Sequence, residues 1–114
     1  TQSGNIIFAG ASSMSGSIPT GFAEGLNGGE HAITFDGNNA TTQLFSGGGN
    51  ILLKGRGSGT GSNTYGVYLV GGVINAGNGT VKIEGAGRNS NNHGVEFYGT
   101  NGNRVGTCTQ HGII

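Results

Sequence analysis

Apolar and polar side chains alternate in several short segments of this chain. In the segment TVKIEGAG (residues 80–87), Lys82 and Glu84 alternate with Val81 and Ile83. A period of two residues is typical of a β-strand with one face toward a core. Glycine-rich stretches separate these segments, which predicts many short strands joined by tight turns.

The same strand pattern returns along the chain in three families. The first family comprises NIIFAGAS (residues 5–12), NILLKGRG (50–57) and TVKIEGAG (80–87). The second family begins at His31, Tyr65 and His93, and a weaker third family begins at Thr42 and Gly72. In the first family, Ile6, Ile51, Val81 and Ile113 are separated by 45, 30 and 32 residues. Repeats of this length predict stacked structural units.

Aligning the copies predicts which side chains face the core. The inward columns are Ile6, Ile51 and Val81; Phe8, Leu53 and Ile83; Ile33, Val67 and Val95; and Phe35, Leu69 and Phe97. The outward columns are Ala9, Lys54 and Glu84, and Thr34, Tyr68 and Glu96. Lys54 and Glu84 are therefore expected to form an opposite-charge pair between neighbouring strands.

Identical face patterns at a fixed period indicate that equivalent strands stack in parallel. The predicted fold is all-β: a right-handed parallel β-helix (β-solenoid) of about three turns, each with three short strands and glycine corners. An antiparallel β-sandwich is the alternative, but it does not account for the recurrence of the same strand.

The first repeat is longer than the others. Its excess is in residues 12–29, which contain the only proline and the only methionine, and an inserted loop is predicted there in the first turn. The 114 residues are expected to form a single domain, with repeats at about 5–49, 50–79 and 80–112 and residues 113–114 beginning a further turn. The chain starts at Thr1 without a signal peptide, so we expect a processed piece or a fragment of a longer protein.

Composition excludes several partners. Charged residues make up 9% of the chain and the formal net charge is zero, which argues against nucleic acid and anionic membranes as partners. No apolar run approaches the roughly 20 residues of a membrane span, so membrane insertion is not expected. Cys108 is the only cysteine, and a small buried side chain is favoured there over a nucleophile or an intermolecular link.

The glycine-rich stretch GRGSGTGSNT (residues 55–64) was tested as a phosphate-binding loop. The dinucleotide fingerprint needs a sixth-position glycine and a following helix. Thr60 occupies the sixth position, and the pattern from Tyr65 to Val70 predicts a strand. The stretch is therefore interpreted as a corner loop.

Candidate chemistry elsewhere is weak. The acids are Glu24, Glu30, Asp36, Glu84 and Glu96, and nothing in the pattern forces two of them into the pair that glycoside cleavage requires. His31 and His93 occupy equivalent positions two turns apart, nearly 10 Å, which is too far to share one zinc ion. With Tyr65 between them they are expected to form an aromatic stack at a corner. An ice-binding rank of threonines is interrupted by Lys54, Tyr68 and Glu96. No catalytic residue, cofactor site or metal site is predicted.

The stretch from Asn50 to Gly99, with its units NILLKGRG, YGVYLVGG, TVKIEGAG and HGVEFYG, resembles the repeats of filamentous-haemagglutinin-like and autotransporter-type bacterial surface adhesins. The resemblance implies a secreted or cell-surface β-solenoid with a structural or adhesive role and no catalytic activity. Its expected partners are identical copies or flanking repeats at the open ends, and host or environmental glycans. A polysaccharide-binding or polysaccharide-cleaving β-helix protein is the alternative.

Overall fold

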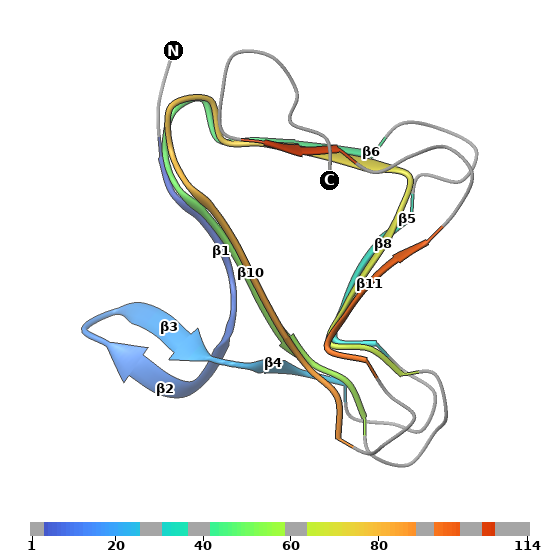
Figure 1. The fold of residues 1–114 in the computed structure, drawn as a ribbon. Coiled ribbons are helices and arrows are strands. Elements are labelled where there is room, and N and C mark those ends of the chain that lie inside the picture. Colours follow the sequence, from blue (N-terminus) through green and yellow to red (C-terminus); the bar gives the residue numbers. More distant parts are fainter. Residues whose placement is uncertain are drawn as a thin grey trace.

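The chain forms parallel β-sheets. The computed structural model describes residues 4–25, 31–36, 42–58, 64–88, 93–98 and 104–106, and within these ranges it contains strands and no helix. Three parallel sheets lie along the sides of a triangle, and an antiparallel hairpin projects outward from one side (Figure 1). The chain passes through the first, second and third sheets in order and then begins again, and we call one such passage a circuit. The expected all-β class with parallel stacking of equivalent strands is confirmed.

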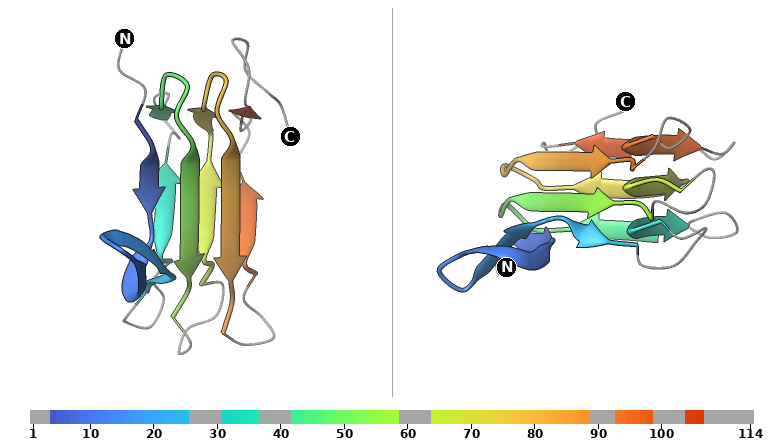
Figure 2. Two further views of the ribbon diagram at one scale, coloured as in Figure 1. Left: turned by 90° about the vertical axis from the view of Figure 1, so that its left-hand side faces the viewer. Right: turned by 90° about the horizontal axis from the view of Figure 1, so that it is seen from below.

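Each sheet contains at least one strand from every circuit, and Figure 2 shows the circuits as successive layers. The first sheet contains β1 (Ile6–Phe8), β7 (Ile51–Arg56) and β10 (Val81–Ala86), with β4 (Ala23–Glu24) also paired to β7. The second sheet contains β5 (Ile33–Asp36), β8 (Val67–Val70) and β11 (Val95–Tyr98). The third contains β6 (Thr42–Phe45), β9 (Gly72–Asn75) and β12 (Arg104–Gly106).

The register between circuits follows the alignment of the repeats. Ile51 lies opposite Ile6 on one side and Val81 on the other. Val67 lies in the same way between Ile33 and Val95. The third sheet continues the pattern, since Thr42 lies opposite Gly72. Because the partners in parallel strands point to the same face, these registers confirm the predicted columns of β1, β7 and β10 and of β5, β8 and β11.

The core lies in the second circuit. Ile51, Leu53, Leu69 and Ile74 are at most 1% exposed, because strands of a neighbouring circuit cover them on both sides. Phe8 and Phe97 belong to inward columns, opposite Leu53 and Leu69, yet each is 40% exposed. The prediction that these two rings face inward therefore needs a correction: their register is as expected, but they lie in the outermost strands, where no further strand covers them within the described residues. The Phe8 ring still packs edge-on against Phe35 of the second sheet, with 6.2 Å between ring centroids.

The insertion of the first circuit differs from the prediction. The chain leaves the ladder after Phe8, opposite Leu53, and returns at Ala23, opposite Gly55. Only the position opposite Lys54 separates the two segments, so residues 9–22 project there as the hairpin of β2 (Gly10–Ser15) and β3 (Ile18–Gly21). The insertion therefore lies in the first circuit, as expected, but it covers residues 9–22 instead of 12–29 and forms a hairpin. The expected place of Ala9 in a column with Lys54 is wrong. A hairpin is possible at this point because its own antiparallel ladder pairs backbone groups that have left the parallel sheet.

Glycines line the corner between the first and second sheets. A Cβ atom added at Gly66 would lie 2.2 Å from the carbonyl oxygen of Gly55, and one added at Gly85 would lie 1.9 Å from that of Gly94. The same contact thus recurs in two successive circuits. Since no real Cβ approaches a carbonyl oxygen so closely, the two backbones can meet at this corner only where side chains are absent.

Replacing Leu69 by Asp should abolish folding or reduce the free energy of unfolding strongly. Truncating a buried leucine costs about 2–5 kcal/mol, and the buried unpaired carboxylate adds to that loss. Gln43→Asp is the matched control, because Gln43 is exposed on β6 and should change stability by about 0.5 kcal/mol or less. Urea unfolding followed by circular dichroism measures both variants, and similar losses would contradict the assigned faces.

Replacing Gly66 by Ala should destabilise the fold by about 1–3 kcal/mol or more, because the new methyl group overlaps backbone atoms of Gly55, Ala86 and Gly94. Gly72→Ala provides the comparison within a strand, since its nearest neighbour is an ordinary contact of 3.6 Å with Phe35. Thermal unfolding of the two variants checks the assignment. Equal stability of both variants would show that the corner is wider than described.

Candidate functional site

Charged side chains gather on the outward face of the first sheet and pair with one another. Lys54 Nζ lies 3.5 Å from Glu84 Oε2, which confirms the expected pair, and Lys82 Nζ lies 3.3 Å from Glu84 Oε1. A hydrogen bond from Lys82, helped by the nearby charge of Lys54, holds the pKa of the Glu84 carboxyl below its usual range. Glu24 pairs with both Arg56 and Arg88. Exposed pairs of this kind contribute little to stability singly, and because four basic side chains share two carboxylates, this face keeps an excess of positive charge.

The hairpin is anchored on the same face. Lys54 Nζ donates a hydrogen bond of 2.9 Å to the Thr20 carbonyl oxygen. The Phe22 ring lies under two cations, 4.8 Å from Lys54 Nζ and 4.6 Å from the Arg56 guanidinium carbon. Cation–π contacts at these distances are favourable. Lys54 and Arg56 therefore help to fix the point where the inserted hairpin rejoins the sheet, which gives these residues a structural role.

Aromatic rings gather beside the second sheet. The rings of His31 and Tyr65 stack with their centroids 5.1 Å apart and their planes at 7°, and those of Tyr65 and His93 stack at 5.5 Å and 23°. The expected stack of His31, Tyr65 and His93 is confirmed. It forms because the three residues precede equivalent strands in successive circuits.

Two further tyrosines extend this stack. The Tyr68 ring lies 4.5 Å from His31 and 6.3 Å from Tyr98, measured between ring centroids. Sequence reasoning placed Tyr68 in an outward column but did not connect it to the stack, and it did not use Tyr98. The residue spacing contained a signal for both tyrosines. Tyr98 lies opposite Val70, which comes two residues after Tyr68, so the two tyrosines are on the same face of the sheet. We call His31, Tyr65, Tyr68, His93 and Tyr98 the aromatic face.

The aromatic face also affects two titrating groups. The Tyr65 backbone N–H donates a hydrogen bond of 2.9 Å to Nδ1 of His31, an atom that accepts only when it carries no proton. Burial lowers the pKa of His31. Burial also raises the pKa of the Tyr68 phenol, and the nearby Tyr98, Tyr65, Glu96 and Asp36 raise it further. The folded state therefore favours the neutral forms of His31 and Tyr68.

The candidate acids do not form one site. Glu24 and Glu84 lie in ion pairs of the first sheet, whereas Asp36 and Glu96 lie in β5 and β11 of the second sheet, separated by β8. Glu96 Oε2 lies 3.0 Å from His93 Nδ1. The expectations for Glu30 and Cys108 lie outside the described residues. Among the residues that the structure describes, no three His, Cys, Asp or Glu side chains lie close enough together to hold a metal ion.

The corner loop at residues 55–64 is described at its two ends. Gly57 and Ser58 follow β7, Thr64 precedes β8, and the Thr64 hydroxyl donates a buried hydrogen bond of 2.7 Å to the Ser58 carbonyl oxygen. The next element is the strand β8, as expected in place of the helix that a dinucleotide-binding loop requires. This stretch is therefore a corner between two sheets.

Comparisons with known proteins identify no relative: no family model, no curated protein and no solved structure matches the chain. The described ranges contain no helix with the length and apolar character of a membrane span.

The stability of the fold should decrease as the pH falls below about 6.5, the usual pKa of histidine. Because the pKa of His31 is lowered in the folded state, the unfolded chain takes up the proton first. The contribution of neutral His31 is complete above pH 6.5 and is lost between that pH and the lower pKa of the folded state. Unfolding measured between pH 7.5 and 5 should show a smaller loss in His31→Gln, which cannot titrate.

Nuclear magnetic resonance of the His31 ring and the Tyr65 amide separates this effect from the titration of the other histidines. The two signals should change together at a pH below 6.5. A His31 ring that titrates at or above 6.5 would contradict the assignment.

Proposed function

We propose that the chain is a non-catalytic structural or adhesive segment of a secreted or cell-surface bacterial protein, built as a right-handed parallel β-helix of about three turns. Three in-register parallel sheets that the chain visits in a constant order support this proposal. The length of the repeat supports it as well, since the paired residues Ile51 and Val81 are 30 residues apart in the sequence. The resemblance to adhesin repeats supplies the biological setting of the proposal.

The observation that carries the proposal is that the end strands of the first two sheets have an uncovered edge. Among the strands that the structure describes, β10 and β11 end these sheets on one side, and β1 and β5 end them on the other. Edge strands present backbone groups that can pair with another strand. Phe97 and Phe8, at opposite ends, expose 40% of their surface although they belong to core columns. Further strands at these ends would pair the backbone groups and cover the rings.

A second copy of the chain, or a flanking repeat, has the strands that fit these ends. With the observed register continued, Val81 of one copy would lie opposite Ile6 of the next, and Val95 opposite Ile33. Phe97 would then lie opposite Phe35 of the next copy, as it now lies opposite Leu69. Apolar residues would meet apolar residues in each column, so end-to-end association would extend the core and produce a filament or a longer stalk.

The test is the state of association of the full chain in solution. Sedimentation velocity at increasing concentration should show growing species, and negative-stain images should show elongated particles. Phe97→Glu should keep the chain monomeric, because it places a charge in the column that the next copy must cover. Phe45→Glu is the matched control, since Phe45 is similarly exposed, 49%, but lies opposite Asn75 in an outward column.

A wild-type chain that stays monomeric at millimolar concentration would overturn association between copies. A loss of association in Phe45→Glu as large as that in Phe97→Glu would also overturn it. Circular dichroism of both variants shows whether each retains its β-structure, so that an unfolded variant is not mistaken for a monomeric one.

A further inference from the structure

At two corners of the molecule, a side chain of one circuit accepts a hydrogen bond from the backbone N–H of the equivalent residue in the next circuit. Asn5 Oδ1 accepts from the Asn50 N–H, and Asn50 Oδ1 accepts from the Thr80 N–H, each at 2.9 Å. His31 Nδ1 accepts in the same way from the Tyr65 N–H, also at 2.9 Å. Both kinds of acceptor atom are bonded to Cγ, so histidine and asparagine can perform the same task.

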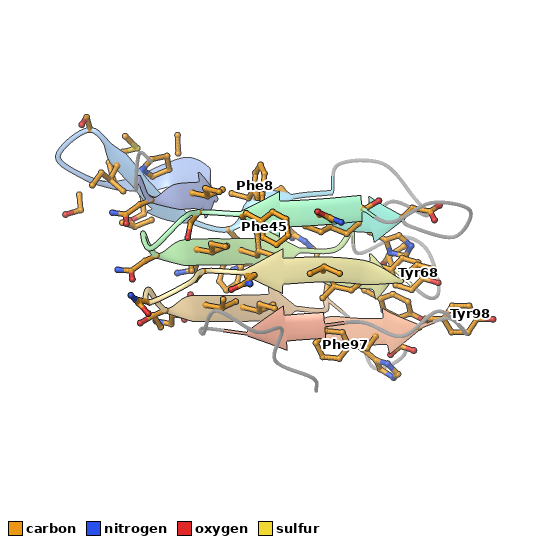
Figure 3. The ribbon with its side chains drawn as sticks, turned by 90° about the horizontal axis from the view of Figure 1, so that it is seen from above. Phe8, Phe45, Tyr68, Phe97 and Tyr98 are labelled. Carbon is orange, nitrogen blue, oxygen red and sulfur yellow. The ribbon has the colours of Figure 1, made fainter. Side chains whose placement is uncertain are left out.

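His93 occupies the equivalent position in the third circuit. It precedes β11 by two residues, as Tyr65 precedes β8 and His31 precedes β5. Its ring stacks on Tyr65 with 5.5 Å between ring centroids, and 63% of its side chain is exposed. Figure 3 shows Phe97 of β11 at one end of the stack of circuits and Phe8 at the other. His93 therefore lies at an end where the next copy would associate.

The Nδ1 atom of His93 has a partner within its own chain. It lies 3.0 Å from Glu96 Oε2. An Nδ1 atom that carries a proton donates to such a carboxylate and cannot accept a hydrogen bond, whereas a neutral ring with its proton on Nε2 has Nδ1 as an acceptor. The protonation of His93 therefore decides whether its Nδ1 can accept an N–H as His31 Nδ1 does.

We propose that His93 makes the junction between copies sensitive to pH, an inference that rests on the end-to-end association proposed above. Neutral His93 accepts at Nδ1 the backbone N–H of His31 of the next copy, and the two imidazole rings stack as His93 stacks on Tyr65 within the chain. Protonated His93 stays paired with Glu96 and cannot accept that hydrogen bond. Association should therefore weaken as the pH falls.

The other titratable or charged groups around the two histidines belong to types that ordinarily titrate outside the range from pH 7.5 to 5.5. They are Tyr65 and Tyr68 beside His31, Tyr65 and Glu96 beside His93, Asp36 and Tyr98 on β5 and β11, the ion pairs of Glu24 with Arg56 and Arg88, and Glu30, which precedes His31 in the sequence. A change of association within this pH range is therefore expected to come from histidine.

The test is the pH dependence of association of the full chain, measured by sedimentation velocity at pH 7.5 and 5.5 and at constant ionic strength. Wild-type association should weaken about tenfold at pH 5.5, as expected for the release of one histidine proton per junction. His93→Asn should associate about equally at both pH values. Its Oδ1 accepts an N–H as in Asn5 and Asn50, and it does not titrate.

His31→Asn is the matched control. The new Oδ1 atom replaces Nδ1 as the acceptor for the Tyr65 N–H, and the substitution removes the other histidine of the junction. Because His93 is unchanged in this variant, its association should keep the tenfold dependence on pH. Circular dichroism at both pH values shows whether each variant is folded, so that unfolding is not mistaken for dissociation.

The outcomes separate this inference from the association on which it rests. Equal association of the wild-type chain at both pH values would overturn the role of His93 and leave end-to-end association intact. A pH dependence that persists in His93→Asn and disappears in His31→Asn would also overturn it, because the sensitivity would then come from His31. A chain that stays monomeric at both pH values would overturn the association itself, and this inference with it.

Discussion

In-register parallel pairing between circuits is the constraint on which the rest of this structure depends. Neighbouring parallel strands lie about 4.8 Å apart, so each circuit must repeat the path of the previous one closely. A side chain in one circuit then meets the equivalent side chain of the next. Ile51 shows the result: it lies between Ile6 and Val81, two copies of the same sequence position, and is 1% exposed.

The glycine corners follow from this constraint. The chain must pass from the first sheet to the second while every circuit stays in register with the previous one. Gly55 and Gly66 permit the two backbones to touch in one circuit, and Gly85 and Gly94 repeat that contact in the next. The same geometry stacks the rings of His31, Tyr65 and His93, because the residues before equivalent strands are brought together by the ladder itself.

The two outward faces show how one scaffold supports different chemistry. On the first sheet, two acids pair with four bases along and across strands, and the same face anchors the hairpin through Phe22. On the second sheet, the stacked rings of the aromatic face lie near Asp36 and Glu96, and Glu96 lies 3.0 Å from His93. Outward positions carry no packing constraint, so they can differ between sheets without disturbing the core.

The sequence by itself determined the strands of the recurring families, their parallel stacking, the inward columns and the pair of Lys54 with Glu84. It could do so because each of these features depends on a residue pattern that recurs once per circuit, and this recurrence can be recognised in the sequence. The stack of His31, Tyr65 and His93 was predictable for the same reason.

Only the tertiary structure decided the features that do not recur from one circuit to the next. The hairpin between Phe8 and Ala23 occurs once, so no second copy showed where the chain leaves and rejoins the ladder, and the sequence placed the insertion too late. The exposure of Phe8 and Phe97 depends on whether a further strand covers β1 and β11, and the alternation of residues within these strands does not determine it. The contact of Tyr68 with Tyr98 joins two different columns, and a diagonal contact depends on side-chain directions that a one-dimensional period does not contain.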